Sequence, residues 1–126
     1  IKKNDLHLLI KNKSIILAYN CLRKKTINGY NYYVLDTIIV DNNFKKRKLG
    51  RYLIVLNKLI SYLNDRPIFL KSNKKIVQFY KKSEFSFLIK KKAFFYFQFN
   101  NKNKKLEKLF KKFKRKIFTL KLNKIN

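Results

Sequence analysis

The sequence predicts a mixed α/β domain, and three observations carry this prediction. Three runs rich in β-branched and aromatic residues open the chain, at 6–10, 14–22 and 30–40. A helical pattern over 49–63 follows, with apolar residues at three- and four-residue spacing, and then a short apolar strand at 68–71. A strand, a helix and a second strand in succession make a parallel pair with a right-handed crossover. We therefore expect a mostly antiparallel sheet with one parallel pair, flanking helices and a basic C-terminal helix.

The first third of the chain is expected to be an antiparallel meander. Residues 11–13, Lys-Asn-Lys, separate the first two runs, which suits a β-hairpin. Residues 23–29 predict a polar loop that ends in Asn28-Gly29, a strong turn signal. The third run, 30–40, is interpreted as a single strand.

The central helix is expected to bury one face and to end at Asn-Asp-Arg-Pro, residues 64–67. A shorter helix at 74–82 and an antiparallel pair at 85–89 and 93–99 follow. The residues predicted on the buried face of the central helix are Leu49, Tyr52, Leu53, Leu56, Ile60 and Leu63.

Residues 102–118 predict a basic amphipathic helix. Such a helix lies on an anionic membrane, binds a partner or docks on its own domain, and docking is the interpretation we favour. We accordingly divide the chain into a domain at 1–100 and a basic tail at 101–126. Its predicted apolar face consists of Leu106, Leu109, Phe110, Phe113 and Ile117.

The net charge of +27 arises from 33 lysines and arginines against six acidic residues in 126. Phosphate-rich partners such as nucleic acid, an anionic membrane or a phosphorylated cofactor would explain it. A composition in which surface positions default to lysine would explain it equally, and the lysines are spread along the whole chain. Charge is therefore a weak guide to function.

The cellular location is predicted from what the sequence lacks. One cysteine, Cys21, excludes an internal disulfide and suits a reducing compartment. No apolar run approaches the roughly 20 residues of a membrane span, and no secretory signal is visible. We expect a cytoplasmic protein, with a nuclear location as the alternative. Because the chain begins at Ile1, its true N-terminal part is expected to be missing.

A basic turn between the third run and the central helix is the first candidate site. Four cations, residues 45–48, precede Gly50, and Arg51 follows it. The N-terminus of a helix offers unpaired N–H donors and the positive end of its dipole, so it binds anions. Ligands in open α/β sheets also favour the carboxyl ends of strands. The turn is therefore predicted to hold a pyrophosphate.

Two motifs stand at the starts of the two predicted helices. Residues 45–50 read Lys-Lys-Arg-Lys-Leu-Gly, and residues 73–85 contain Asn73, Phe79, Tyr80 and Phe85. In this order of elements they resemble the GNAT superfamily of N-acetyltransferases, whose motifs are Arg/Gln-x-x-Gly-x-Gly/Ala and Asn-x-x-small-x-x-Phe-Tyr-x-x-x-Gly-Phe. In the first motif Lys48 replaces the first glycine and Gly50 matches the last. In the second, Asn73, Phe79, Tyr80 and Phe85 match, whereas Ile76 and Glu84 depart from the pattern. The resemblance covers about residues 6–99.

The resemblance implies an enzyme that moves acetyl from acetyl-CoA to a primary amine, by direct attack in a ternary complex and without a metal. The turn would hold the pyrophosphate of the coenzyme, and residues 38–40 would pair with its pantetheine arm. Tyr80 would protonate the departing thiolate, and Asp36 would accept a proton from the amine. The implied coenzyme contacts are Ile38, Ile39, Val40, Lys45, Arg47, Lys48, Leu49, Gly50, Arg51, Tyr52, Asn73, Phe79 and Tyr80.

Each of these side chains also has a purely structural interpretation. Tyr80 lies on an apolar helix face, Asp36 has many cations to pair with, and Asn73 suits a helix cap. His7 and Cys21 are interpreted as structural. No cluster of residues has the spacing of metal ligands.

The acceptor is left open between a protein N-terminus, a lysine and an amino sugar. Lys-Leu-Gly at 48–50 and Phe-Tyr-Lys-Lys at 79–82 are similar to glucosamine-6-phosphate N-acetyltransferases. A basic surface favours an acidic acceptor. The alternatives are a non-catalytic RNA- or ribosome-binding module and a degenerate acetyltransferase, although most aromatic residues fall at core-periodic positions rather than forming a stacking platform.

Overall fold

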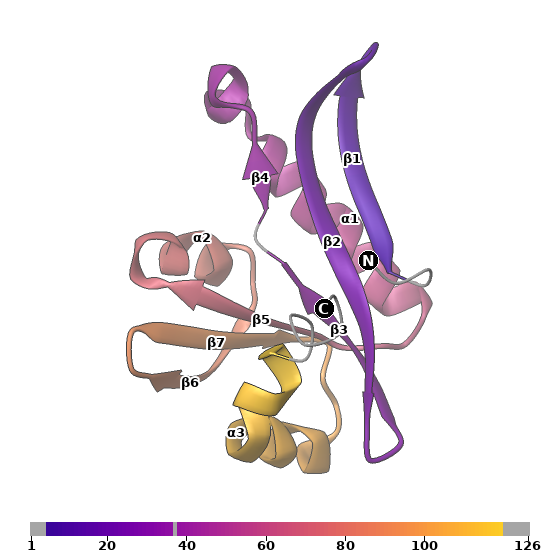
Figure 1. The fold of residues 1–126 in the computed structure, drawn as a ribbon, viewed down its shortest axis with the longest axis vertical. Helices are drawn as coiled ribbons and strands as arrows, with labels where there is room; N and C mark the ends of the chain where they lie inside the picture. Colours follow the sequence, from indigo (N-terminus) through magenta and orange to yellow (C-terminus); the bar gives the residue numbers. More distant parts are fainter. Residues whose placement is uncertain (1–4, 37, 120–126) are drawn as a thin grey trace.

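The computed structural model describes residues 5–36 and 38–119, and its strands form one twisted sheet (Figure 1). The strand order is β1-β2-β3-β5-β7-β6, with β4 paired to β2. Every pair is antiparallel except β3–β5, so the predicted mixed sheet is confirmed. The strands are β1 Leu6–Asn12, β2 Ile15–Ile27, β3 Tyr30–Leu35, β4 Ile39–Val40, β5 Ile68–Asn73, β6 Ser86–Lys91 and β7 Phe94–Phe99.

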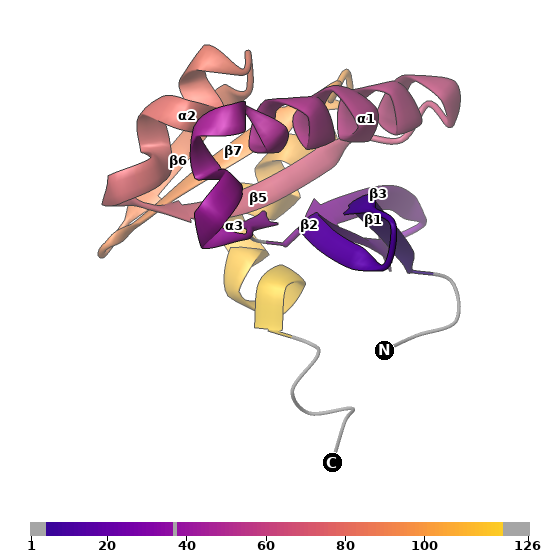
Figure 2. The same ribbon diagram turned by 90° about the horizontal axis from the view of Figure 1, so that it is seen from above.

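Helices cover both faces of the sheet (Figure 2). Helices α1 (Leu49–Leu63) and α2 (Val77–Lys82) lie on one face, and α3 (Lys104–Thr119) lies on the other. Short 3₁₀ helices, η1 (Asn42–Arg47) and η2 (Lys74–Ile76), precede α1 and α2. No helix in the described ranges combines the length and the apolar character that a membrane crossing needs.

The tail helix docks on the domain, as the favoured interpretation held. Leu106 and Phe110 are almost fully buried against the sheet. The ring of Phe110 stacks on Phe69 with centroids 3.8 Å apart, and its edge meets Tyr32 at 5.9 Å. The side chains of Phe113 and Ile117, which we also predicted on the apolar face, lie outside the described part of the chain.

The loop predicted at 23–29 is wrong, because β2 continues to Ile27 and only Asn28-Gly29 forms the turn. Both turn residues have positive φ, 49° and 82°, as a two-residue hairpin turn requires. The polar side chains of this stretch are compatible with a strand, since cross-strand pairing with β3 decides the conformation.

The single strand predicted at 30–40 is also wrong, because it divides into β3 and β4. Leu35 pairs with Leu22 and Ile39 pairs with Tyr19, both on β2. Three residues separate Leu35 from Ile39, whereas only two separate Leu22 from Tyr19 on β2. One extra residue on one strand of an antiparallel pair is the definition of a β-bulge. The bulge bends the strand, and β3 pairs with β5 at only two positions before the strands separate.

The buried face of α1 is rotated relative to the prediction. Leu49 and Leu53 are buried, but Tyr52, Leu56 and Leu63 are exposed. The reason is a buried amide pair, in which Asn57 and Asn20 exchange hydrogen bonds of 2.9 and 3.0 Å. Hydrogen bonding fixes the orientation of this helix where hydrophobic periodicity alone predicts another one. The buried residues of α1 are Leu49, Leu53, Ile54, Asn57 and Ser61.

Candidate active site

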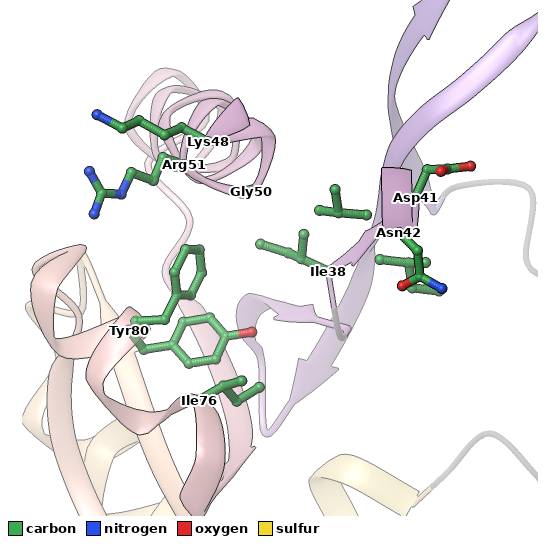
Figure 3. Close-up of a pocket in the computed structure, with 11 residues that line it drawn as sticks. Ile38, Asp41, Asn42, Lys48, Gly50, Arg51, Ile76 and Tyr80 are labelled. Atoms are coloured by element: carbon green, nitrogen blue, oxygen red, sulfur yellow. The ribbon is translucent and has the colours of Figure 1, made fainter. Parts of the chain in front are cut away.

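A cavity of about 950 Å³ opens where β4 and β5 have separated. The end of β4, the first turn of α1, and the η2–α2 segment surround it (Figure 3). This position, at the carboxyl end of a parallel pair, is the one expected for a ligand in an open α/β sheet. The lining residues are Ile38, Ile39, Val40, Asp41, Asn42, Lys48, Gly50, Arg51, Ile76, Phe79 and Tyr80.

The start of α1 gives the cavity a positive end. Lys48 precedes the helix with φ 59° and ψ 26°, and its side chain makes no capping hydrogen bond. The first turn contains no acidic residue, so no side chain of the helix itself offsets the positive end of its dipole. Lys48 and Arg51 extend from this turn at the rim of the cavity (Figure 3). The turn therefore has the charge that a pyrophosphate needs.

The left-handed conformation of Lys48 explains why glycine suits this position in the motif. A residue other than glycine in the left-handed region lowers the stability of the folded state by roughly 1 kcal/mol. The chain adopts this conformation at Lys48 despite that cost.

Gly50 lies where the helix comes closest to α2 and the bulged strand. A Cβ atom at this position would be 3.4 Å from Cζ of Phe79 and 3.9 Å from Cγ2 of Ile38. A Cβ atom would thus just reach van der Waals contact, and a longer side chain would compete with Phe79 and Ile38 for the same space. Gly50 therefore keeps the cavity open between its two walls.

Tyr80 is a core residue, with 3% of its surface exposed, and it also lines the cavity. Its ring packs against Phe79, Phe85 and Phe97 at centroid distances of 5.2, 5.9 and 6.1 Å. Figure 3 shows its hydroxyl directed toward the bulged strand. Burial raises the pKa of Tyr80 to about 12. The side chain is thus a neutral phenol, held rigidly, with its hydroxyl on the cavity.

Asp36 is placed differently, because it forms an ion pair and does not line the cavity. Its Oδ2 accepts from Nε of Arg23 at 2.7 Å and lies 2.6 Å from Nη2. Arg23 also approaches Asp5 at 3.6 Å. The ion-pair alternative is the one found, with arginine rather than lysine as partner. A role for Asp36 in proton transfer stays a prediction.

Asn73 caps the short helix η2, as its structural interpretation held. Its Oδ1 accepts a hydrogen bond of 2.9 Å from the backbone N–H of Lys75, and it does not line the cavity.

Two described residues of the predicted turn, Leu49 and Tyr52, do not line the cavity. The side chain of Leu49 is buried in the core and that of Tyr52 points to solvent, so only their backbone could serve a ligand. Lys45 and Arg47 belong to η1, and their side chains lie outside the described part of the chain. Predicted contacts that do line the cavity are Ile38, Ile39, Val40, Lys48, Gly50, Arg51, Phe79 and Tyr80.

Sequence reasoning missed three lining residues, Asp41, Asn42 and Ile76. Asp41 and Asn42 follow the last residue of β4 directly, and the rule that ligands gather at the carboxyl ends of strands would have found them. Asp41 caps η1 by accepting a 2.9 Å hydrogen bond from the N–H of Asn43. Ile76 stands where the motif has a small residue, and it narrows the cavity beside Tyr80.

Comparisons with known proteins were made by sequence and by structure. No protein-family model and no curated protein matches the sequence. A GNAT-family acetyltransferase from Listeria monocytogenes has a TM-score of 0.58 at 19% identity, over 68% of this chain and 58% of its own. A GNAT-family protein from Desulfovibrio desulfuricans has a TM-score of 0.67 at 18% identity, over 75% of this chain and 67% of its own. The N-acetyltransferase YlbP from Bacillus subtilis, in complex with coenzyme A, has a TM-score of 0.60 at 18% identity, over 75% of this chain and 67% of its own.

These likenesses confirm the fold that the two motifs predicted. The chain spans 58% of the length of the Listeria protein and 67% of the other two.

Proposed function

We propose that this chain, which has the fold of the GNAT acetyltransferases, moves an acetyl group from acetyl-CoA to a primary amine. The observation that carries the proposal is the cavity itself. It brings the start of α1, the bulged strand and Tyr80 together around one space of about 950 Å³. The two motifs that resemble the family meet in this space although residues 51–72 separate them in the sequence.

The residues present fit a coenzyme at two points. The uncapped first turn of α1, with Lys48 and Arg51, would hold the pyrophosphate. Strand β4 pairs with β2 alone in the described part of the chain, so its other edge is available to an extended pantetheine arm. Ile38, Val40 and Phe79 would give that arm an apolar wall.

Bound acetyl-CoA would supply the thioester carbonyl that the amine attacks. The backbone N–H of Val40 would polarise this carbonyl, since it points to the free edge of β4. The N–H groups of Ile39 and Asp41 face β2, where Asp41 donates to the carbonyl of Leu17 at 2.8 Å. The hydroxyl of Tyr80 would give its proton to the departing sulfur. With a pKa raised to about 12, Tyr80 carries its proton at neutral pH, as a tyrosine of ordinary pKa also does. The same dry surroundings would raise the proton affinity of the thiolate, which favours the transfer.

The proton that the amine releases needs an acceptor, on the side of strand β4 away from Tyr80. Asp36 would take it through water, with its ion pair to Arg23 fixing the position of the carboxylate. Asp36 lies off the cavity wall, whereas Tyr80 lines it. We therefore assign Asp36 a smaller share of catalysis than Tyr80.

The acceptor class that we propose is an amine carried by an acidic molecule, such as an acidic protein N-terminus or an amino-sugar phosphate. A net charge of +27 attracts such acceptors and raises their association rate at low salt.

An assay of coenzyme thiol release tests the proposal. The panel contains an acidic N-terminal peptide, a neutral N-terminal peptide, a lysine peptide and glucosamine-6-phosphate, with mass spectrometry of each product. We expect acetylated product with at least one acceptor, and a preference for acidic ones that shrinks as salt is raised. Acetyl transfer to none of these amines, by protein shown to be folded, would contradict the proposal.

A further inference from the structure

Six large apolar side chains of α1 are exposed, and the ring of one of them, Tyr62, also contacts Phe99 at a centroid distance of 5.1 Å. Their spacing of three and four residues puts them on one face of the helix. Figure 2 shows α1 lying across the sheet with one side turned away from the rest of the chain. Continuous apolar surface of this kind marks an interaction site. The six residues, which we call the outer strip, are Tyr52, Val55, Leu56, Leu59, Tyr62 and Leu63, with exposed fractions from 43% to 82%.

The lysine-rich composition does not extend to this helix. Helix α1 carries two basic residues in 15, Arg51 and Lys58, whereas the 16 residues of α3 carry eight. Lys58 is engaged elsewhere, because its Nζ donates to the carbonyl of Ser83 at 2.9 Å and lies 3.7 Å from Glu84. If exposed positions simply defaulted to lysine, the outer strip would contain lysine. An apolar strip on such a surface therefore has a function of its own.

We propose that a second copy of this chain covers the outer strip. Two chains of net charge +27 repel each other, and they can approach most cheaply where the local charge is lowest. The outer strip is such a place, and an uncharged apolar face is complementary to itself. An acidic partner would instead gain most from lysine-rich surfaces such as the exposed side of α3.

The pairing would be antiparallel about a two-fold axis, as the arrangement of the strip indicates. The strip is centred between Leu56 and Leu59, so these two residues would meet across the axis. Tyr52 of one copy would then face Leu63 of the other, and the end with Arg51 would approach the end with Asp65. Antiparallel helices also set opposite dipole ends side by side. Such an isologous contact closes on itself and gives a dimer rather than a fibre.

The mass of the protein in solution tests this inference independently of any acetyl transfer. Sedimentation equilibrium at micromolar concentration should give twice the 15.4 kDa of one chain. The double variant Leu56→Lys/Leu59→Lys should be monomeric, with its dissociation constant raised at least about 100-fold. Both sites are exposed, so the circular dichroism spectrum should not change. The matched control Ile15→Lys/Ile16→Lys, on the exposed β1–β2 hairpin, should remain dimeric. A monomeric wild type, or a dimer that only the control disrupts, would overturn the inference.

Cysteine cross-linking tests the antiparallel geometry even if a lysine variant fails to fold. Residue 59 would lie close to its own copy across the axis. Residue 52 would be displaced from its copy by about 16 Å along the helices, given a rise of roughly 1.5 Å per residue. Oxidation should therefore link Leu59→Cys into a covalent dimer and leave Tyr52→Cys unlinked. Wild type is the background, because Cys21 is buried. Equal linking of both variants would contradict the antiparallel pairing, and linking of neither would contradict the interface.

Discussion

Tyr80 and Asp36, the two side chains assigned to proton transfer, have opposite surroundings. Tyr80 is enclosed by three aromatic rings and lines the cavity. Asp36 is held in an ion pair with Arg23 and lies off the cavity wall. The coenzyme side of the proposed site follows from backbone geometry and packing that the fold itself imposes. The acceptor side depends on particular side chains, such as Asp36 and Arg23. We therefore expect the features that are specific to this protein to lie on the acceptor side.

The largest effect is expected from removing the hydroxyl of Tyr80. Tyr80→Phe keeps the buried ring, so folding and acetyl-CoA affinity should be unchanged, the latter within about twofold. Turnover should fall about 100-fold, which is typical for the loss of a general acid. Calorimetry measures the acetyl-CoA affinity, and a steady-state assay with the best acceptor measures the turnover. Unchanged turnover would show that Tyr80 is a core residue without a part in catalysis.

The stability of the wild type at alkaline pH measures how deeply the Tyr80 hydroxyl is buried. Its pKa is raised from 10.0 to about 12, so the folded state holds the proton where the unfolded state has released it. The sign of the linkage makes the wild type lose stability as pH rises above 10, relative to Tyr80→Phe. Between pH 10 and 11 the loss should be about 1 kcal/mol in urea unfolding. A difference that stays constant with pH would show a hydroxyl open to solvent.

A smaller effect is expected at Asp36. Because Asp36 is held in an ion pair with Arg23 and lies off the cavity wall, Asp36→Asn should lower turnover less than about tenfold. Acetyl-CoA affinity should be unchanged. The assay is the one used for Tyr80→Phe, with Asp41→Asn beside it to measure the effect of another carboxylate at the strand end. A loss for Asp36→Asn equal to that for Tyr80→Phe would remove the contrast between the two sides.

The smallest effect concerns the backbone at Lys48. A left-handed φ of 59° favours glycine, so Lys48→Gly should stabilise the protein by about 1 kcal/mol in urea unfolding. Coenzyme affinity should change little, because a gain in backbone fit offsets the loss of one charge. Lys92→Gly, which has φ 58° far from the cavity, is the matched control and should give a similar stabilisation. A destabilised Lys48→Gly would mean that the lysine side chain itself holds the turn.

The sequence predicted the residues around the cavity better than the surroundings of Asp36, for physical reasons. The order of elements, Gly50 and Tyr80 follow from local patterns, since a turn before an amphipathic helix has its own composition. The bulge between β3 and β4 is invisible in a continuous apolar run, because it depends on the register of β2. The orientation of α1 likewise depends on Asn20, a residue 37 positions from its partner Asn57. Long-range pairings of this kind decide where Asp36 points, and no local pattern encodes them.

The measurement that tests the central claim most directly is calorimetric titration of acetyl-CoA at physiological salt. The account predicts micromolar binding by the wild type, and none by Gly50→Glu, whose carboxylate would enter the cavity between Phe79 and Ile38. Gln78→Glu adds the same charge on the exposed side of α2, and it should bind like the wild type. Single-stranded RNA, titrated in parallel, tests the alternative of a basic binding module. Tight RNA binding that weakens steeply with salt, together with no binding of acetyl-CoA, would contradict the account.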